Sequence, residues 1–303
     1  MRTVLPEPLS PGARIGVVAP AGPIRPALLR EGLAYLRRRG YRVVEGRSLR
    51  AHHGYLAGTD AQRAADLNRA LADDSLDAVV FARGGYGSGR ILERLEFSPL
   101  RRRPKIFLGY SDITAFYAAL LNATGIPGFY GPMVLNFNGP GTEFRESSLW
   151  AALERRPGWN RFSLSPGGVL RGGAARGRLV GGCLSLLVSL IGTPYDLDSR
   201  GAILFWEEVG EEPYKIDRML NHLRMAGKLR HLRGMVVGRL QGCKAKGSAA
   251  GLPLPEILRD HLRGTDFPVV INFPAGHAPG KVTLPLGLPA RLDTRTRCLE
   301  ILA

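Results

Sequence analysis

The sequence predicts an α/β protein, with a parallel-sheet domain in the first half and a smaller mixed domain in the second. Short apolar runs alternate with segments of helical periodicity as far as Gly131. This alternation is typical of a mainly parallel sheet that is covered by helices on both faces. The 39 glycines and 22 prolines favour many tight turns over a helical bundle, and 45% of the 303 residues are hydrophobic, which is ample for such cores.

In the first half, the expected strands and helices follow one another in regular order. The strands are 13–19, 41–45, 77–82, 106–108 and 128–131. The helices are 26–39, a segment that begins at Thr59, a short segment at 91–95 and a longer one at 113–121. Ligands bind at the carboxyl ends of strands in such sheets, so we expect loops 83–88 and 109–112 to face one another.

The second half begins after a stretch of different composition. Residues 136–177 are rich in Gly, Pro and Arg and show weak periodicity, so we place the connection between domains there. The predicted division is a domain at 1–140, a linker at 141–176 and a second domain at 177–303. The second domain is expected to contain helices 177–191, 214–225 and 255–262, strands 202–209, 235–240 and 269–273, and a closing hairpin of 290–292 and 298–302.

The net charge of +16 raises the question of a nucleic-acid partner. The basic residues are spread along the chain, 36 of the 42 are arginine, and aromatic residues are not interleaved with the two Arg-Arg-Arg runs. We therefore expect no nucleic-acid partner. No apolar run is long enough to span a membrane, and residues 1–11 lack the apolar region of a secretory signal, so a cytoplasmic protein is expected.

The sequence also predicts no metal or other cofactor. The three cysteines are far apart and form no C-x-x-C pair, and the six histidines form no H-E-x-x-H or H-x-H arrangement.

A sharp turn is expected at 109–112, between the apolar run 106–108 and the helix that follows. It places Ser111 in the position of a nucleophile elbow, which lifts a serine hydroxyl above the end of a sheet. The free N–H groups of the helix N-terminus favour negative charge there. The second glycine of G-x-S-x-G is absent, and the alternative is that Ser111 or Asp112 merely caps the helix.

A serine nucleophile needs a base, and the base needs an orienting acid. The best base is His277, which follows an expected buried strand in a loop rich in Gly and Pro, although His52 and His53 also lie in a loop. For the acid, Glu207 and Glu208 interrupt an otherwise apolar strand, where a carboxylate is costly unless it is paired. Alternation places these two glutamates on opposite faces and does not choose between them. The alternative is a structural pair with Lys215 or Arg218.

The glycine-rich turn at 83–89 has two functional interpretations. It could hold a phosphate at a helix N-terminus, but G-x-x-x-x-G-K-[ST] is absent. It could instead donate the Gly85 N–H to an oxyanion, beside that of Asp112. A tight turn without function is the alternative.

Four stretches of the chain together match a known family. They are Ala82-Arg-Gly-Gly-Tyr-Gly-Ser-Gly-Arg90, Leu108-Gly-Tyr-Ser-Asp-Ile113, Leu204-Phe-Trp-Glu-Glu-Val209 with Tyr214-Lys-Ile-Asp-Arg-Met-Leu220, and Phe273-Pro-Ala-Gly-His277. In this order and spacing, the chain resembles the LD-carboxypeptidases (muramoyltetrapeptide carboxypeptidases) and their relatives, the microcin C self-immunity peptidases. The resemblance extends from about Ala13 to Leu302.

The resemblance implies a triad of Ser111 as nucleophile, His277 as general base and Glu207 as the acid, with Glu208 at a position where many relatives have Asp. It also implies an oxyanion hole formed by the backbone N–H groups of Gly85 and Asp112. The implied fold is an N-terminal domain similar to flavodoxin or to glutamine amidotransferases, followed by a β-rich, swivelling C-terminal domain.

The implied reaction releases terminal D-alanine from murein tetrapeptides during cell-wall recycling, through an acyl-enzyme and without a cofactor. The substrate is a small murein peptide, and family members are commonly homodimers. Guanidinium groups bind carboxylates well, so Arg83 and Arg90 are candidates for holding the substrate carboxylate. Two alternatives remain: hydrolysis of a peptidyl-adenylate amide, as in microcin C self-immunity, and a binding module without chemistry.

Overall fold

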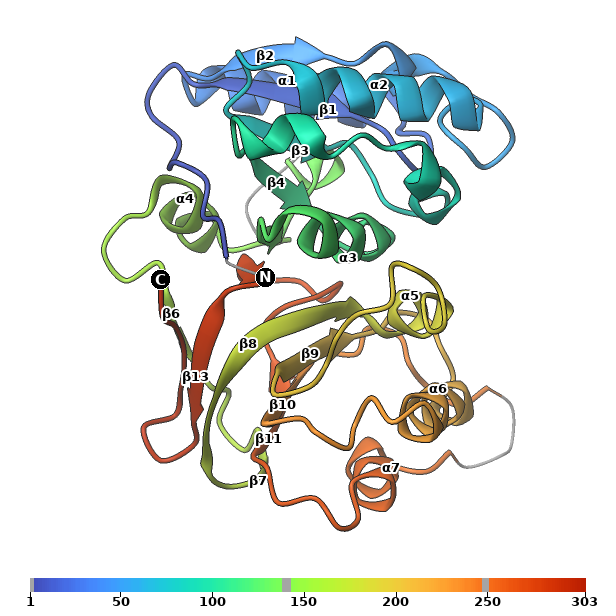
Figure 1. Ribbon diagram of the computed structural model, residues 1–303, viewed down its shortest axis with the longest axis vertical. Helices are drawn as coiled ribbons and strands as arrows, with labels where there is room; N and C mark the ends of the chain where they lie inside the picture. Colours follow the sequence, from blue (N-terminus) through green and yellow to red (C-terminus); the bar gives the residue numbers. More distant parts are fainter. Residues whose placement is uncertain (1–2, 138–142, 247–250) are drawn as a thin grey trace. The chain divides into compact units, whose positions relative to one another are not determined.

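The computed structural model describes residues 3–137, 143–246 and 251–303, which form two compact units (Figure 1). Unit 1 comprises Met1–Trp159 and Pro279–Gly287, and unit 2 comprises Asn160–Ala278 and Leu288–Ala303. The chain therefore returns to unit 1 for one short segment late in the sequence. Residues 141 and 142, the first two of the predicted linker, lie outside the described residues.

Unit 1 contains a six-stranded sheet in the order β12-β5-β4-β3-β1-β2. Its strands are β1 (Arg14–Val18), β2 (Arg42–Glu45), β3 (Ala78–Phe81), β4 (Ile106–Gly109), β5 (Gly128–Tyr130) and β12 (Leu284–Leu286). Strands β1 to β5 are parallel and β12 is antiparallel to β5, which confirms the predicted parallel-rich α/β domain. The order 2-1-3-4-5 is that of flavodoxin. It reverses between β1 and β3, and loops at such a reversal form the crevice in which ligands bind.

The helices of unit 1 begin and end where local chemistry favours it. They are α1 (Pro26–Arg38), α2 (Asp60–Ala72), α3 (Ile113–Thr124) and α4 (Glu146–Glu154), with 3₁₀ helices at Arg47–Arg50, Ser88–Arg94, Ser98–Arg101 and Val134–Asn136. Helix α1 has proline in its first turn, and Thr59 and Gln62 form a capping box at the start of α2. Helix α3 ends at Gly125, which takes the left-handed conformation with φ 74°.

Helix α3 holds the middle of unit 1 together. Its residues from Ile113 to Leu121 are all buried, as expected for a helix that is apolar on every side. The buried Tyr117 hydroxyl lies 2.9–3.1 Å from the carbonyl oxygens of Phe107, Gly109 and Phe129, which ties α3 to β4 and β5. This contact fixes α3 directly beside the end of β4, where the Ser111 turn lies.

Unit 2 contains an eight-stranded sheet in the order β6-β14-β13-β8-β9-β10-β11-β7. Its strands are β6 (Arg161–Ser163), β7 (Val169–Arg171), β8 (Ala174–Cys183), β9 (Ile203–Glu207), β10 (Gly234–Gly238), β11 (Val269–Phe273), β13 (Pro289–Asp293) and β14 (Cys298–Ile301). Strands β8 to β11 are parallel, and the others pair antiparallel. The predicted closing hairpin is confirmed as β13 and β14.

Three helices pack beside the parallel strands of unit 2, as Figure 1 shows. They are α5 (Leu184–Ser189), α6 (Pro213–Met225) and α7 (Leu254–His261). Their apolar side chains share one core with those of β9 and β10. No helix in the described ranges is both long and apolar enough to cross a membrane.

The helix predicted at 177–191 is wrong in its first part. Residues up to Cys183 belong to β8, and only Leu184–Ser189 are helical. The physical reason is the glycines. Gly181 has φ 139°, and a Cβ there would overlap the backbone of the neighbouring strand at Phe205. Glycine permits this close approach and weakens a helix.

The segment expected as a connection carries more regular structure than its composition suggested. It contains α4, β6 and β7. The strands have three residues each, too few to show an alternating pattern, and α4 has only nine. Helix α4 nevertheless contributes Leu149, Trp150 and Leu153 to the core of unit 1. The domain boundaries predicted from the sequence remain predictions.

Gly32→Ala should destabilise the protein, although alanine is the better helix former. Gly32 lies in α1, and a Cβ there would come within 2.5 Å of Val134 Cγ1 and closer still to the Val134 carbonyl oxygen. We expect the free energy of unfolding to fall by about 1–3 kcal/mol, the usual cost of overpacking, instead of rising by about 1 kcal/mol. Urea unfolding measures this difference. Arg30→Ala, at an exposed site on the same helix, is the control and should change little; a stabilised Gly32→Ala variant would contradict the packing described.

Candidate active site

Ser111 lies at the turn between β4 and α3, in a strained conformation. Its φ is 65°, in the left-handed region that residues other than glycine rarely adopt. Its backbone N–H donates to the Tyr130 hydroxyl at 3.1 Å. This strand–turn–helix geometry is the one predicted for a nucleophile elbow. Strain of this kind costs on the order of 1–3 kcal/mol and is concentrated at functional sites.

Three loops of unit 1 meet around Ser111. A Cβ on Gly84, in the loop after β3, would come within 3.0 Å of Ser111 Cβ and 3.2 Å of its Oγ. The loop after β1 joins them, because Gly22 N–H donates to the Gly84 carbonyl at 3.0 Å. The next residue, Gly85, has φ 99°. Loops that follow β1, β3 and β4 thus converge at the carboxyl ends of these strands, where the reversal of strand order predicts a ligand site.

Asp112 is buried and links the Ser111 turn to the glycine-rich loop. Its Oδ2 accepts the Ser88 N–H at 2.8 Å, and its carbonyl accepts the Ser88 hydroxyl at 2.6 Å. Asp112 stands at the N-cap position of α3, but its side chain makes no cap hydrogen bond to that helix. The carboxylate therefore fixes the loop that contains Gly85, and a simple capping role does not describe it.

The two arginines considered for substrate binding also lie in unit 1, and both are exposed. Arg83 Nη1 donates to the Pro23 carbonyl at 2.8 Å. Arg90 contacts both oxygens of Asp60, with distances of 2.9–3.2 Å. The hydrogen bond from Arg90 lowers the pKa of the Asp60 carboxyl. Both guanidinium groups thus have partners within the protein, and a role of either in binding substrate remains a prediction.

In unit 2, Glu207 and His277 form a buried acid–base pair. Glu207 is the last residue of β9 and is fully buried. Its Oε2 accepts the His277 Nδ1 proton at 2.7 Å and the His277 backbone N–H at 3.0 Å. Because an ionised carboxylate can only accept, this contact places the imidazole proton on Nδ1 and leaves Nε2 as the basic nitrogen. This is the arrangement in which an acid orients a general base.

Glycines allow these two side chains to meet. Strand β10 lies between β9 and β11, and a Cβ on Gly238 would come within 2.7 Å of both Glu207 Cβ and the Ala275 carbonyl oxygen. Gly276 has φ 111°, and a Cβ there would lie 2.5 Å from Glu207 Oε2. The loop after β11 can therefore pass directly over the carboxylate only because neither position carries a side chain.

Glu208 has a different set of partners from Glu207. Its carboxylate accepts the N–H groups of Ser185 and Val209, at 2.8 and 2.9 Å, and so holds the first turn of α5. Cys183 Sγ lies 3.5 Å from it, and burial together with the two nearby glutamates raises the pKa of that thiol well above its usual value. Glu207, and not Glu208, is bound to His277. Lys215, considered as a structural partner, lies near Glu211 and Glu212 instead.

Comparison with known families identifies the chain. The family model for the LD-carboxypeptidase N-terminal domain matches residues 15–131, and the model for the LD-carboxypeptidase C-terminal domain matches residues 176–292. The chain belongs to the LD-carboxypeptidase family.

Relatives of this LD-carboxypeptidase family member match almost end to end. It is 40% identical over 301 residues to a probable murein peptide carboxypeptidase of Bacillus subtilis, covering 98% of this chain and 93% of the relative. A structure of MccF in complex with glutamyl sulfamoyl guanosine superposes with a TM-score of 0.88 at 25% identity, covering 98% of each chain. The muramoyltetrapeptide carboxypeptidase from Oxalobacter formigenes superposes with a TM-score of 0.82 at 28% identity, covering 95% of this chain and 98% of that one.

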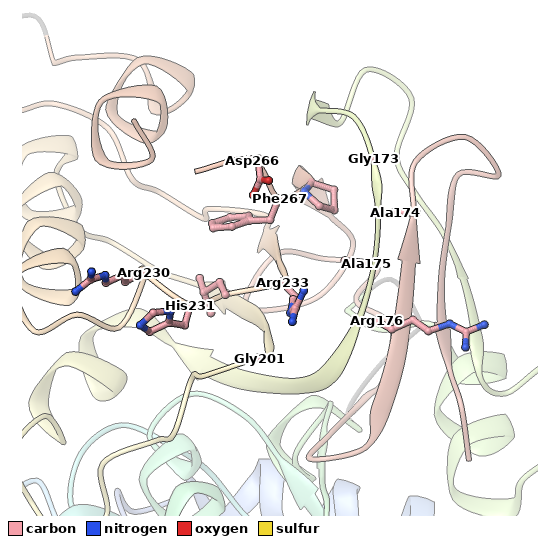
Figure 2. A pocket seen from close by; sticks show the side chains of 12 residues that line it. Gly173, Ala174, Ala175, Arg176, Gly201, Arg230, His231, Arg233, Asp266 and Phe267 are labelled. Carbon is pink, nitrogen blue, oxygen red and sulfur yellow. The ribbon is translucent and has the colours of Figure 1, made fainter. Parts of the chain in front are cut away.

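This member of the LD-carboxypeptidase family also has a cavity of about 670 Å³ in unit 2, at the end of the sheet opposite to Glu207 and His277 (Figure 2). It lies where β9, β10 and β11 begin, whereas Glu207 and His277 lie where these strands end. The cavity is lined by Gly173, Ala174, Ala175, Arg176, Gly201, Arg230, His231, Leu232, Arg233, Asp266, Phe267 and Pro268. Figure 2 shows the side chains of Arg176 and Arg230 pointing away from one another.

The sequence predicts Ser111, Glu207 and His277 as site residues but does not indicate the residues that lie against them, such as Tyr130 and Gly238. Glycines in strands are a weak signal of close approach, which could have indicated Gly238. Among the described residues, no cluster of His, Cys, Asp or Glu is suited to hold a metal ion.

The strain at Ser111 predicts an inverted order of stability for two variants. At most sites alanine stabilises a protein relative to glycine by about 0.4–1 kcal/mol. At φ 65° we expect Ser111→Gly to be more stable than Ser111→Ala by about 1 kcal/mol, because only glycine adopts this conformation freely. Thermal or urea unfolding of the two variants measures the difference. Equal stability, or a more stable alanine variant, would show that the turn is not strained.

Proposed function

We propose that this chain is an LD-carboxypeptidase that releases terminal D-alanine from murein tetrapeptides in peptidoglycan recycling. The observation that carries the proposal is the Glu207–His277 pair, an oriented base, in a chain that also presents Ser111 on a strained elbow. The 40% identity to a probable murein peptide carboxypeptidase supports a murein peptide as substrate.

In the proposed mechanism, Ser111 Oγ attacks the carbonyl carbon of the amide that joins an L-centre to D-alanine. His277 Nε2 takes the serine proton, and Glu207 stabilises the resulting imidazolium. The N–H groups of Gly85 and Asp112 receive the oxyanion of the tetrahedral intermediate. The intermediate collapses to an acyl-enzyme as His277 returns the proton to the leaving amine of D-alanine. Water, deprotonated by His277, then hydrolyses the ester and regenerates Ser111.

This mechanism requires residues of both units to act on one substrate. Ser111, Gly85 and Asp112 belong to unit 1, whereas Glu207 and His277 belong to unit 2. We therefore propose that activity requires residues from both units.

The proposal also covers how the substrate is bound, where the protein is located and its oligomeric state. A carboxypeptidase must bind a free carboxylate, and Arg83 is the better candidate than Arg90, whose guanidinium is already paired with Asp60. The net charge of +16 would attract a multiply anionic muropeptide. We propose a cytoplasmic homodimer that needs no cofactor.

The first test is mass spectrometry of the purified protein incubated separately with a murein tetrapeptide, the corresponding pentapeptide and a peptidyl-adenylate. We expect loss of one alanine from the tetrapeptide alone, and no loss with Ser111→Ala, because that variant has no nucleophile. Cleavage of the adenylate alone would move the protein to the self-immunity branch of the family. No turnover of any of the three would favour a binding module.

The second test asks whether Ser111 and His277 act together in the same catalytic step. Residues of a triad are strongly non-additive, because the loss of one member disables the others. We expect Ser111→Ala, His277→Ala and the double variant to lower kcat by the same factor, about 10³-fold or more. Steady-state kinetics with the tetrapeptide measures this. If the double variant loses the product of the two single losses, the two residues act independently and the triad is rejected.

A further inference from the structure

Arg63 is a buried charge that the mechanism above does not use. It lies on α2 in unit 1, and its side chain is 0% exposed. Burial lowers the pKa of its guanidinium. A buried guanidinium is costly unless its donors are satisfied, so the partners of Arg63 indicate what holds it there.

The partners of Arg63 are backbone carbonyls of three separate loops. Its Nε donates to the Gly58 carbonyl at 3.3 Å, and its Nη1 donates to the carbonyls of Gly87, at 2.8 Å, and of Pro20. Its Nη2 pairs with Asp60, a carboxylate that Arg63 shares with Arg90. One planar group thus ties together the loop after β1, the loop before α2 and the loop after β3.

Two of these loops, those after β1 and β3, lie around the Ser111 turn. Gly87 lies two residues beyond Gly85, and Pro20 lies two residues before Gly22, whose N–H binds the Gly84 carbonyl. The loop after β3 is therefore held at both ends of a short segment, by Gly22 at Gly84 and by Arg63 at Gly87. Gly85 and Tyr86 lie between these two points. The packing is tight at Gly87, because a Cβ there would lie 2.6 Å from Leu56 and 3.0 Å from Arg63 Nη1.

We propose that Arg63 is a positioning residue for the peptidase reaction, which aims the Gly85 N–H at the oxyanion through the Gly87 and Pro20 carbonyls. This inference rests on the oxyanion role given to Gly85 in the proposed function. An oxyanion donor acts mainly in the transition state, so its displacement should lower kcat with little change in KM. A purely structural role would lower stability and leave kcat of the folded protein unchanged.

The test compares Arg63→Met and Arg63→Lys with Arg69→Met. Arg69 lies on the same helix, with a half-exposed side chain paired to Asp66, and is the matched control. We measure kcat and KM for the tetrapeptide, the rate at which a fluorophosphonate labels Ser111, and the thermal midpoint. Phosphonylation also develops charge on an oxygen that the oxyanion hole receives, so it reports on the same donors.

We expect Arg63→Met to lower kcat by about 10²-fold with KM within about threefold, and to slow labelling of Ser111 in parallel. Arg63→Lys should recover part of the loss, because an ammonium group can bind one or two of the carbonyls. Arg69→Met should be unchanged. Folded Arg63 variants with kcat and labelling rates within about threefold of the parent would overturn the proposal, as would failure of both to fold, which assigns Arg63 to stability alone.

The two proposals fail in distinguishable ways. If the parent protein does not cleave the tetrapeptide but Ser111 is still labelled, the substrate assignment is rejected. The labelling rates of the Arg63 variants then decide the positioning role by themselves. If the parent serine is not labelled at all, the oxyanion role of Gly85 and the inference built on it are both rejected.

Discussion

The candidate site depends on close approach of glycine backbone to Ser111 and Glu207. Gly84 lies against Ser111 in unit 1, and Gly238 and Gly276 lie against Glu207 in unit 2. At Gly238 and Gly276 the distances leave no room for a Cβ, and at Gly276 the positive φ also favours glycine, whereas at Gly84 a Cβ would make a tight contact of 3.0 Å. The consequence is that, within each unit, the position of the loop and that of the side chain it faces are coupled. A methyl group added at Gly238 or Gly276 would displace Glu207.

Charge burial supplies the second constraint. Glu207 is tolerated without exposure because two hydrogen bonds from His277 satisfy Oε2, and Glu208 because two backbone N–H groups satisfy its carboxylate. Glu207 at the end of β9 thus holds the candidate base, and Glu208, the next residue, holds the start of α5. Arg63 follows the same rule in unit 1, where its buried guanidinium is compensated by carbonyls and by Asp60.

These constraints explain what the sequence could predict. The alternation of strands and helices, the turn at Ser111 and the closing hairpin are local, and they follow from periodicity and turn chemistry. The β8 strand was mistaken for helix because the leucines after Cys183 have helical spacing, while the strand before them is defined by its contact with β9. The choice between Glu207 and Glu208 depends on Gly238, 31 residues further along the chain. The sequence does not indicate the role of Arg63, because three of its partners are backbone carbonyls, which every residue carries.

Each unit orders its own candidate site residues through contacts within that unit. The positive φ of Ser111 and the hydrogen bond from its N–H to the Tyr130 hydroxyl both belong to unit 1. The hydrogen bond by which Glu207 orients His277 belongs to unit 2. Each half is therefore preorganised by its own fold. Preorganisation of this kind lets binding energy act on the transition state instead of on the ordering of the catalytic groups. By this argument, substitutions at Gly84 or Arg63 should leave the Glu207–His277 hydrogen bond intact, and substitutions at Gly238 should leave the Ser111 turn intact.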